Sequence, residues 1–260
     1  MPHRKRRSSQ QERHAQLLAL LRREGTVRIA TLASLFGVTT ETARRDLDEL
    51  ARRGALQRTY GGGASRSLID EPGIAARNRT HAAERGLIGV AAARLAEAGD
   101  ALLIDCGSTT SAFARALAAR DLHLTVVTNC LPVAIALGTG AHCRVLLCPG
   151  DYAIREGGVF GADTLEYLRR FKANKAFIGA GGLTPDGVTD ADSPGAAVKR
   201  AMIGRADRTL LLVDGSKYDL VQFERVCPLT DIDDLISDEV PPPRLAAGLK
   251  GADVRVTVAK

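Results

Sequence analysis

Five short stretches of small and polar residues each directly follow a run of apolar residues. They are Asp105-Cys106-Gly107-Ser108-Thr109-Thr110, Thr128-Asn129, Pro149-Gly150-Asp151, Gly179-Ala180-Gly181-Gly182 and Asp214-Gly215-Ser216-Lys217. Small residues let backbone N–H groups approach an anion, while hydroxyls and a helix N-terminus add donors that favour negative charge. The recurrence of this pattern predicts a binding site for a small anionic ligand.

The segment GSTT at 107–110 opens a helix-like stretch and is the candidate cradle for a phosphate. Asp105 would accept hydrogen bonds from sugar hydroxyls, and Lys199 and Lys217 would supply positive charge. Simpler interpretations remain open. GSTT can be a turn with a Ser or Thr N-cap, Asp214 can cap a helix, and Lys199 can be a solvated lysine.

Seven apolar runs precede, follow or separate these stretches and alternate with helix-like segments. The runs are 101–105, 124–128, 144–148, 176–180, 209–214, 234–237 and 254–258. Alternation of this kind predicts an α/β domain with a parallel-rich sheet covered on both faces. The polar stretches would then share one sheet edge, where ligands bind. The sequence holds neither a Walker A motif nor a GxGxxG opening a first βαβ unit, so a nucleotide is disfavoured.

A second candidate chemistry lies near the N-terminus, in VTTETARRDLDEL at 38–50. Ala43, Leu47 and Leu50 have helical spacing, which leaves Arg44 and Arg45 on the outer side of this helix. An exposed arginine pair is either a solvated face or a group that contacts DNA. Arginine binds guanine in bidentate fashion or holds a phosphate.

The surrounding pattern favours DNA. Helix-like segments at 12–25 and 26–38 precede this helix, Gly37 allows a tight turn, and Thr39 occupies the N-cap position. A basic, β-capable run at 55–60 and GGG at 61–63 predict a wing. The layout is that of a winged helix-turn-helix.

Candidate DNA contacts fall into two groups. Base-reading candidates come from the start of the third helix and are Thr39, Thr40, Glu41, Thr42, Arg44 and Arg45. Phosphate-contact candidates are Arg28, Arg52, Arg53 and Arg58, and the RKRR run at 4–7 adds non-specific attraction.

Charge is divided unevenly along the chain. Residues 1–66 hold 14 Lys and Arg against 6 Asp and Glu, whereas the remaining residues hold 22 against 24. The surplus predicts a polyanionic partner for the N-terminal piece alone. Apolar content of 45% is typical of a globular protein, and no apolar run has the length of a membrane span.

The five cysteines have neither CxxC nor zinc spacing, and the N-terminus has no apolar segment typical of a secretory signal. They are Cys106, Cys130, Cys143, Cys148 and Cys227. We therefore expect a cytoplasmic protein with reduced, buried thiols, no metal, no cofactor and no membrane partner.

The stretch GTVRIATLASLFGVTTETARRDLDELARRGALQRTYGGGA resembles the winged helix-turn-helix of the DeoR family of bacterial transcription regulators. It contains the run V(S/T)xxTxRRDLxxL followed by G, R and GGA that is typical of that family. Ala43 departs from the pattern, because the family usually has a larger apolar residue there, and looser helix packing is expected.

The second half resembles the sensor domain of the same family through DCGSTT, VTN, GGVFG, KAFIGAGG, AAVKRAMI and DGSKY, in that order. The resemblance implies a fold similar to ribose-5-phosphate isomerase and a phosphorylated-sugar effector. Implied effector contacts are Asp105, Gly107, Ser108, Thr109, Thr110, Thr128, Asn129, Lys199 and Lys217. Gly181, Gly195 and Pro149 depart from the family pattern and are expected to line the sugar end of the pocket.

The leading hypothesis is a transcription regulator, a repressor released from double-stranded operator DNA by a phosphorylated sugar or polyol. The alternatives are a sugar-phosphate isomerase or deaminase and a non-specific nucleic-acid or scaffold protein. For an enzyme, Asp151, Glu156 and Asp186 are available, but none lies in a recognisable catalytic run. Palindromic operators imply a dimer or tetramer.

The expected organisation has four parts. A basic tail spans 1–10, the winged helix-turn-helix 11–66, a linker 67–81 and the sugar-phosphate-sensing domain 82–260.

Overall fold

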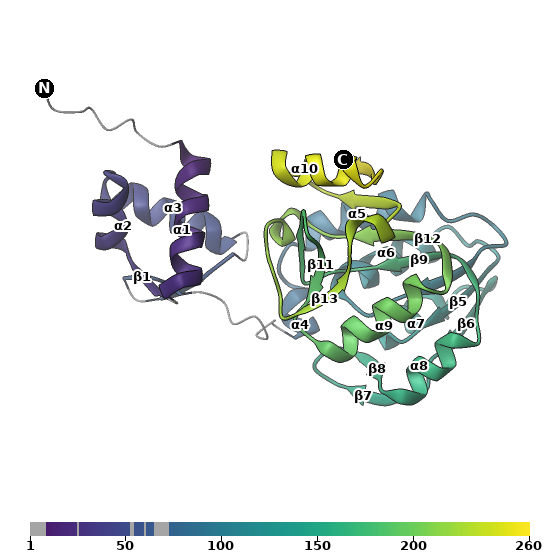
Figure 1. The fold of residues 1–260 in the computed structure, drawn as a ribbon. Helices are drawn as coiled ribbons and strands as arrows, with labels where there is room; N and C mark the ends of the chain where they lie inside the picture. Colours follow the sequence, from purple (N-terminus) through teal and green to yellow (C-terminus); the bar gives the residue numbers. More distant parts are fainter. Residues whose placement is uncertain (1–8, 25, 53–54, 60, 65–72) are drawn as a thin grey trace, which may run out of the picture. The chain divides into compact units, whose positions relative to one another are not determined.

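The computed structural model describes residues 9–24, 26–52, 55–59, 61–64 and 73–260 (Figure 1). Its contacts divide the chain into two compact units, residues 1–67 and 68–260, and each unit is described by itself. The RKRR run at 4–7 lies outside the described residues. None of the helices described is both long enough and apolar enough to cross a membrane.

The first unit is a winged helix-turn-helix, as predicted. Its elements are α1 (Gln10–Glu24), β1 (Thr26–Arg28), α2 (Ile29–Phe36), α3 (Thr40–Arg52), β2 (Gln57–Thr59) and β3 (Gly62–Ala64). The strands form an antiparallel sheet in the order β1-β3-β2. Leu17, Leu32, Leu47 and Leu50 are buried together between the helices, so an aliphatic core holds the unit.

Local sequence explains the turn before α3. Gly37 has a φ of 63°, a left-handed conformation that glycine adopts without strain. The hydroxyl of Thr39 accepts a hydrogen bond from the Thr42 N–H at 3.1 Å, so Thr39 is the expected cap. The expected helix at 26–38 is wrong for its first three residues, which form strand β1. β1 pairs with β3, where a Cβ on Gly62 would lie 2.0 Å from the Val27 carbonyl oxygen, so only glycine fits.

The second unit is built on a seven-stranded sheet whose strands are all parallel. The strands are β4 (Ala101–Ile104), β5 (Leu124–Thr128), β6 (Cys143–Leu147), β9 (Ala173–Ile178), β12 (Ala206–Leu212), β14 (Asp234–Ser237) and β15 (Arg255–Val258), in the spatial order β15-β14-β12-β9-β4-β5-β6. These are the seven runs expected from the sequence. The chain builds outward from β4 through β5 to β6, then returns to β9 on the other side of β4, so the strand order reverses between β4 and β9.

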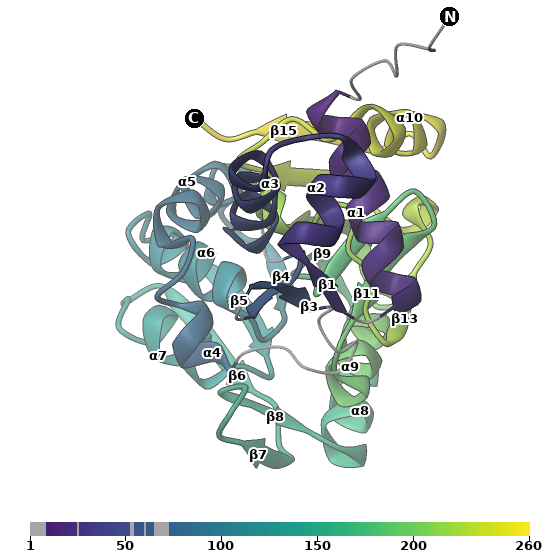
Figure 2. The same ribbon diagram turned by 90° about the vertical axis from the view of Figure 1, so that its left-hand side faces the viewer.

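Helices cover both faces of this sheet (Figure 2). One face packs on α5 (Ala82–Ala93), α6 (Ser108–Ala118) and α7 (Leu131–Leu137). The other face packs on α8 (Ala162–Arg169), α9 (Ser193–Ile203) and α10 (Pro243–Gly251). Side chains alternate between the two cores: Leu102 and Ile104 of β4 enter the first core and Leu103 the second.

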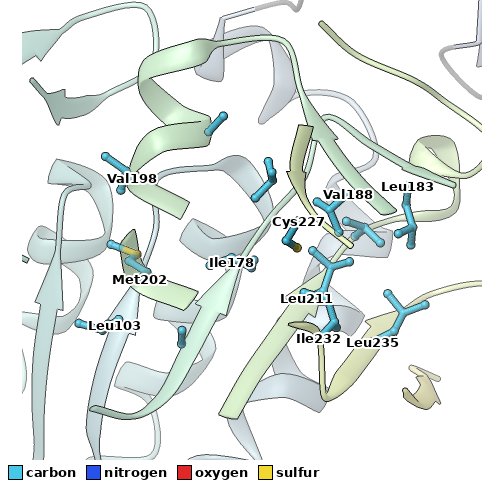
Figure 3. Close-up of a cluster of buried hydrophobic side chains, with 14 of the residues drawn as sticks. Leu103, Ile178, Leu183, Val188, Val198, Met202, Leu211, Cys227, Ile232 and Leu235 are labelled. Carbon is cyan, nitrogen blue, oxygen red and sulfur yellow. The ribbon is translucent and has the colours of Figure 1, made fainter. Parts of the chain in front are cut away.

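Figure 3 shows the second core, in which Val198 and Met202 of α9 lie towards Leu103, while Leu211 and Leu235 lie on the other side of Ile178. Val198 is fully buried. Because Val198 and Met202 are packed into this core, they fix the rotation of α9. They therefore also fix the direction of Lys199, the residue after Val198.

The burial expected for all seven strands is wrong at the two edges of the sheet. β6 is only partly buried, and the first three residues of β15 are exposed. Each is an edge strand, so one of its sides has no neighbouring strand. The five central strands are the ones enclosed by helices on both faces.

Smaller elements lie outside the main sheet, most of them after the carboxyl ends of its strands. One is a hairpin of β7 (Asp151–Ala153) and β8 (Gly158–Phe160). Another is an antiparallel sheet of β10 (Gly182–Thr184), β11 (Gly187–Asp190) and β13 (Glu224–Cys227). Two short 3₁₀ helices are η1 (Gly215–Lys217) and η2 (Leu229–Asp231).

Part of the segment expected as a linker lies on the second unit. Residues 74–77 form α4 (Ile74–Arg77), and Ile74 is buried. Its N–H donates to the Arg155 carbonyl oxygen at 2.9 Å. Residues 65–72 of the expected linker region lie outside the described residues.

Candidate functional site

The outer face of α3 presents the arginine pair to solvent. The side chains of Arg44 and Arg45 are 56% and 79% exposed, and each lies 3.3 Å from a carboxylate oxygen of Glu41. Because Glu41 is itself 56% exposed, these ion pairs are solvent-screened and hold the guanidinium groups only weakly. Both arginines are therefore available to a partner.

The other candidate DNA contacts surround this face. Arg28, Thr39, Thr40 and Arg52 are exposed, and Thr42 is half-buried. Arg58 on β2 pairs with Asp48 of α3 at 2.8 Å and donates to the Gly62 carbonyl oxygen, so it also ties the wing to α3. Arg53 lies outside the described residues.

A buried carboxylate fixes the inner side of α3, and it was missed from the sequence. Asp46, with a side chain only 4% exposed, accepts from Arg13 at 2.8 Å and contacts the His14 ring nitrogen at 3.1 Å. Burial raises the pKa of Asp46, but the hydrogen bonds from Arg13 and His14 outweigh it and hold the pKa below its usual value. The signal was available, because position 46 falls on the same helical stripe as Ala43 and Leu50.

One cavity of the second unit lies where the strand order reverses. It is lined by the loops that follow β4, β5 and β9, by the start of α6 and by α9. In open α/β sheets, ligands bind at the carboxyl ends of the strands at such a switch point. The topology alone therefore explains why the polar stretches converge.

Most of the predicted effector residues line this cavity. They are Asp105, Gly107, Ser108, Thr109, Asn129, Lys199 and Lys217. Thr110 and Thr128 are not among its lining residues. Both are fully buried, and their hydroxyls donate to the carbonyl oxygens of Asp105 and Ile104. Through these hydrogen bonds the two threonines hold β4 and the loop that follows it.

The N-terminus of α6 forms one wall of the cavity. Gly107 is the N-cap and makes no side-chain cap hydrogen bond, so the interpretation of GSTT as a Ser or Thr N-cap is wrong. Ser108 and Thr109, in the first turn, face the cavity. The first N–H groups of a helix have no intrahelical partner, and the helix dipole favours negative charge there.

Lys199 is buried, so its interpretation as a solvated lysine is wrong. Its ammonium lies 3.0 Å from Asp105 and 2.9 Å from Asp190, and its side chain is 7% exposed. Burial alone lowers the pKa of Lys199, but the two carboxylates raise it above its usual value. Lys199 is therefore charged, and its two ion pairs link α9 to β11 and to the loop after β4.

Two buried acceptors point to an absent partner. Asp105 uses one carboxylate oxygen for Lys199 and for the Gly179 N–H, and its Oδ1 has no hydrogen-bond partner among the described residues. Asn129 donates its amide to the Val159 carbonyl oxygen, and its Oδ1 is likewise unpaired there. Buried polar atoms are normally satisfied. Ligand hydroxyls at this edge would satisfy both.

Four charged lining residues were not predicted as effector contacts: Arg77, Glu156, Asp190 and Asp192. Arg77 of α4 pairs with Glu156 of the β7–β8 connection at 2.7 Å. Asp192 is the N-cap of α9 and accepts from the Gly195 N–H at 2.8 Å. Glu156 appeared in the sequence only as a candidate catalytic acid, and Arg77 fell in the expected linker.

A buried ion pair connects α4 to the Asp214 loop. Arg85 of α5 pairs with Asp214 at 2.9 Å and donates to the carbonyl oxygens of Arg77 and Thr80. Burial raises the pKa of Asp214, but the Arg85 charge and a hydrogen bond from Ser216 outweigh it and lower the pKa. Asp214 also caps η1, as one sequence interpretation held. Lys217, at the end of η1, lines the cavity.

Of the three departures from the family pattern, two are cavity residues. Gly181 and Gly195 line it, whereas Pro149 is not among the lining residues. A Cβ at Gly181 would lie 3.0 Å from Gln222 and one at Gly195 would lie 3.0 Å from Asp192. A side chain at either position would need these neighbours to shift.

Both units match families of known sequences. Residues 13–67 match the DeoR-like helix-turn-helix domain and residues 80–239 match the DeoR C terminal sensor domain. The chain belongs to the DeoR family. The predicted fold class, a winged helix-turn-helix followed by an α/β sensor domain, is thereby confirmed.

Curated DeoR-type relatives match over nearly the whole chain. The glycerol-3-phosphate regulon repressor of Escherichia coli (strain K12) is 31% identical over 90% of this chain and 92% of its own length. The HTH-type transcriptional repressor GlcR of Bacillus subtilis (strain 168) is also 31% identical, over 89% and 90%. These matches indicate a DNA-binding transcription regulator, and they do not support the isomerase or deaminase alternative.

Solved structures similar to this DeoR-family chain are more distant. Ribose 5-phosphate isomerase A from Methanocaldococcus jannaschii is 15% identical, with a TM-score of 0.41 over 53% of this chain and 55% of that one. eIF2B delta from Chaetomium thermophilum is 16% identical, with a TM-score of 0.48 over 87% and 70%. Likenesses at this level say nothing about activity.

Proposed function

We propose that this DeoR-family regulator is a repressor that leaves its operator when a phosphorylated sugar or polyol binds the cavity of its second unit. The observation that carries the proposal is the cavity itself. It combines the N-terminus of α6 with two buried acceptors, Asp105 Oδ1 and Asn129 Oδ1, that have no hydrogen-bond partner among the described residues.

The phosphate end is assigned to the first turn of α6. There Ser108 and Thr109 offer hydroxyls and backbone N–H groups, and Lys217 lines the same cavity. Helix N-termini bind phosphate through these groups and the helix dipole. Lys199 does not supply the free charge expected of it, because Asp105 and Asp190 already neutralise it.

The charge balance of the cavity favours a ligand that also carries hydroxyls. Its lining holds four carboxylates, Asp105, Glu156, Asp190 and Asp192, against three cations, Arg77, Lys199 and Lys217. Net charge therefore does not attract an anion, and a bare phosphate would meet repulsion beyond α6. Carboxylate and amide oxygens accept from hydroxyls, which supports a sugar or polyol.

Arg77 offers a connection to the DNA-binding unit. It lies ten residues beyond Ser67, where the first unit ends, and its side chain lines the cavity. A ligand phosphate would compete with Glu156 for this guanidinium and bias the position of α4. A ligand alters DNA affinity only if it binds two arrangements of the protein unequally. A 5–150-fold switch corresponds to a coupling of about 1–3 kcal/mol.

The test is Thr109→Glu, which places a negative charge where the phosphate is assigned. We expect repulsion to abolish effector binding while operator binding persists, since the helix-turn-helix belongs to the other unit. The variant would act as an uninducible repressor in the cell. The measurement is an operator mobility shift for the variant and the parent across a panel and titration of sugar phosphates.

Thr139→Glu is the matched control, because Thr139 is exposed beyond the far end of α7 and adds the same charge. Lys217→Gln gives a second, milder test on a half-buried side chain. If Thr109→Glu and Lys217→Gln both release DNA at the parent's effector concentration, the phosphate is not bound at α6. The site would then move toward Lys199 and the GAGG loop.

The same proposal covers partners and location. We expect pairs of helix-turn-helix units on a palindromic operator, hence a dimer or tetramer, and action in the cytoplasm. Sedimentation of the protein with and without operator DNA measures the oligomeric state directly.

A further inference from the structure

Two cysteines meet in the wall of the cavity, and neither has a part in the proposed function. The Sγ atoms of Cys106 and Cys130 are 2.8 Å apart. Cys106 lines the cavity and is half-buried, whereas Cys130 is completely buried. All five cysteines of the chain are free thiols in this structure.

The sheet register brings this pair together. Ile104 is paired with Thr128 across the parallel strands β4 and β5, and the two cysteines each follow two residues later. Neighbouring strands lie about 4.7–4.9 Å apart, within the range of Cα separations that a disulfide spans. Bonding distance is about 2.05 Å, so the sulfurs need to approach by less than about 1 Å.

The surroundings also keep the pair close. A Cβ at Gly158 would lie 2.9 Å from the Cys106 sulfur, so the glycine leaves the space that this thiol occupies. Cys106 also contacts the Glu156 carbonyl oxygen at 3.2 Å. Gly158 in turn bridges to Cys130. Strand β8 therefore lies against both cysteines.

We propose that Cys106 and Cys130 are a modification site, a dithiol that forms a reversible disulfide when a hydroperoxide enters the cavity. The hydrogen bond from the Cys106 thiol lowers the pKa of Cys130, and the same hydrogen bond, with burial, raises the pKa of Cys106. Cys130 is therefore the more acidic of the two thiols, which suits it to attack an oxidised Cys106 sulfur in a second step. Cys106 faces the cavity, so its sulfur is the one that a hydroperoxide reaches first.

The chemistry balances with one hydroperoxide. The Cys106 sulfur attacks the peroxide, a sulfur–oxygen bond forms and the oxygen–oxygen bond breaks. The Cys106 thiol proton passes to the leaving oxygen, which gives a sulfenic acid and water or an alcohol. The Cys130 sulfur then attacks the Cys106 sulfur, the sulfur–oxygen bond breaks, and the leaving hydroxide takes the Cys130 proton as water. Two thiols lose two electrons and the peroxide gains them.

The consequence is local to the cavity. The disulfide would join the loop between β4 and α6 to the loop between β5 and α7, which both contribute lining residues. Cys106 directly precedes Gly107, the N-cap of α6. Oxidation would therefore fix the position of the α6 N-terminus, and a thiol reductant would release it.

The experiment treats the reduced full-length protein with hydrogen peroxide and counts thiols after denaturation. We expect two of the five thiols to be lost, the intact mass to fall by that of two hydrogen atoms, and a non-reducing peptide map to join residues 106 and 130. Dithiothreitol should restore all five. Cys143→Ser, a half-buried thiol on β6, is the control and should behave as the parent.

Single substitutions separate the two roles. Cys130→Ser should leave a sulfenic acid at Cys106 that dimedone traps, and Cys106→Ser should protect Cys130, which has no exposed surface. The proposal is overturned if the parent keeps five thiols, or if Cys106 is oxidised without a cross-link to Cys130. None of these measurements uses an effector or DNA, so the outcome is independent of the proposed function.

Discussion

The two units use charge in opposite ways. On α3, the guanidinium groups of Arg44 and Arg45 stand in solvent and meet Glu41 only at 3.3 Å. In the second unit, Lys199 is 7% exposed and its ammonium lies within 3.0 Å of two carboxylates. The first arrangement leaves charge available for a partner, whereas the second uses charge to hold the protein together.

The difference has an energetic basis. An exposed ion pair contributes about 0–1 kcal/mol, because water and salt screen it. Removing one member of a buried pair costs about 3–5 kcal/mol, because the remaining charge stays desolvated. Substitutions of the exposed arginines on α3 should therefore change DNA affinity and leave the stability of the fold unchanged. Substitutions of Lys199 or its carboxylate partners should instead lower the stability of the fold.

Replacing the arginine pair tests the first half of this comparison. Arg44→Ala with Arg45→Ala should weaken operator binding by about 2–6 kcal/mol, taking about 1–3 kcal/mol for each specific contact. The melting temperature should stay near that of the parent, since neither side chain is buried. Fluorescence anisotropy with labelled operator measures the affinity. If the double variant binds as the parent does, α3 is not the recognition helix.

Replacing the buried lysine tests the second half. Lys199→Met leaves Asp105 and Asp190 without their shared cation and should lower the free energy of unfolding of the second unit by about 3–5 kcal/mol. Urea unfolding followed by circular dichroism is the measurement. Lys172→Met is the control, because Lys172 forms a 2.6 Å pair with Asp207 that is 60% exposed on the lysine side. Equal losses from both variants would contradict the distinction drawn here.

The sequence was sufficient for the strands of the main sheet and insufficient for the contacts between elements. Apolar runs located all seven strands of the sheet, and burial on both faces explains the continuous pattern of the five central ones. The role of Lys199 was beyond reach, since its partners Asp105 and Asp190 lie on other elements. Strand order places β9 beside β4, and periodicity along the chain carries no information about that order.

Arg77 shows the same limit at the cavity. Its segment is polar and short, as a linker would be, and its partner Glu156 is 79 residues away. Thr109 lines the cavity, and its position is local, at the first turn of a helix that the sequence itself predicts. Local motifs therefore placed several candidates at the cavity, whereas the lining residue Arg77, held by a long-range ion pair, was missed.

Asp46 shares features with both regions, because it is a buried charged residue on α3. Its substitution is expected to give the smallest of the three effects. It lies on α3 with the exposed arginines, yet it is buried and bonded to Arg13 and His14 of α1. Asp46→Asn keeps the size of the side chain and removes the charge. We expect α1 and α3 to lose about 1–3 kcal/mol of protection, the range for a buried hydrogen-bonded group. Hydrogen exchange of the full chain, resolved by peptide, measures this loss against unchanged peptides of α5 and α6.

The dependence on pH distinguishes lost charge from lost shape. The folded pKa of Asp46 lies below its unfolded value of about 3.9, so its stabilising contribution is complete above that value. It disappears as the pH falls through the folded pKa. Parent and Asp46→Asn should therefore differ most at neutral pH and converge in acid. Asp48→Asn, on the same helix but with a half-exposed carboxylate paired to Arg58, should show a much smaller difference at every pH. If the two variants lose equal protection, burial does not determine how much a carboxylate on α3 contributes to stability.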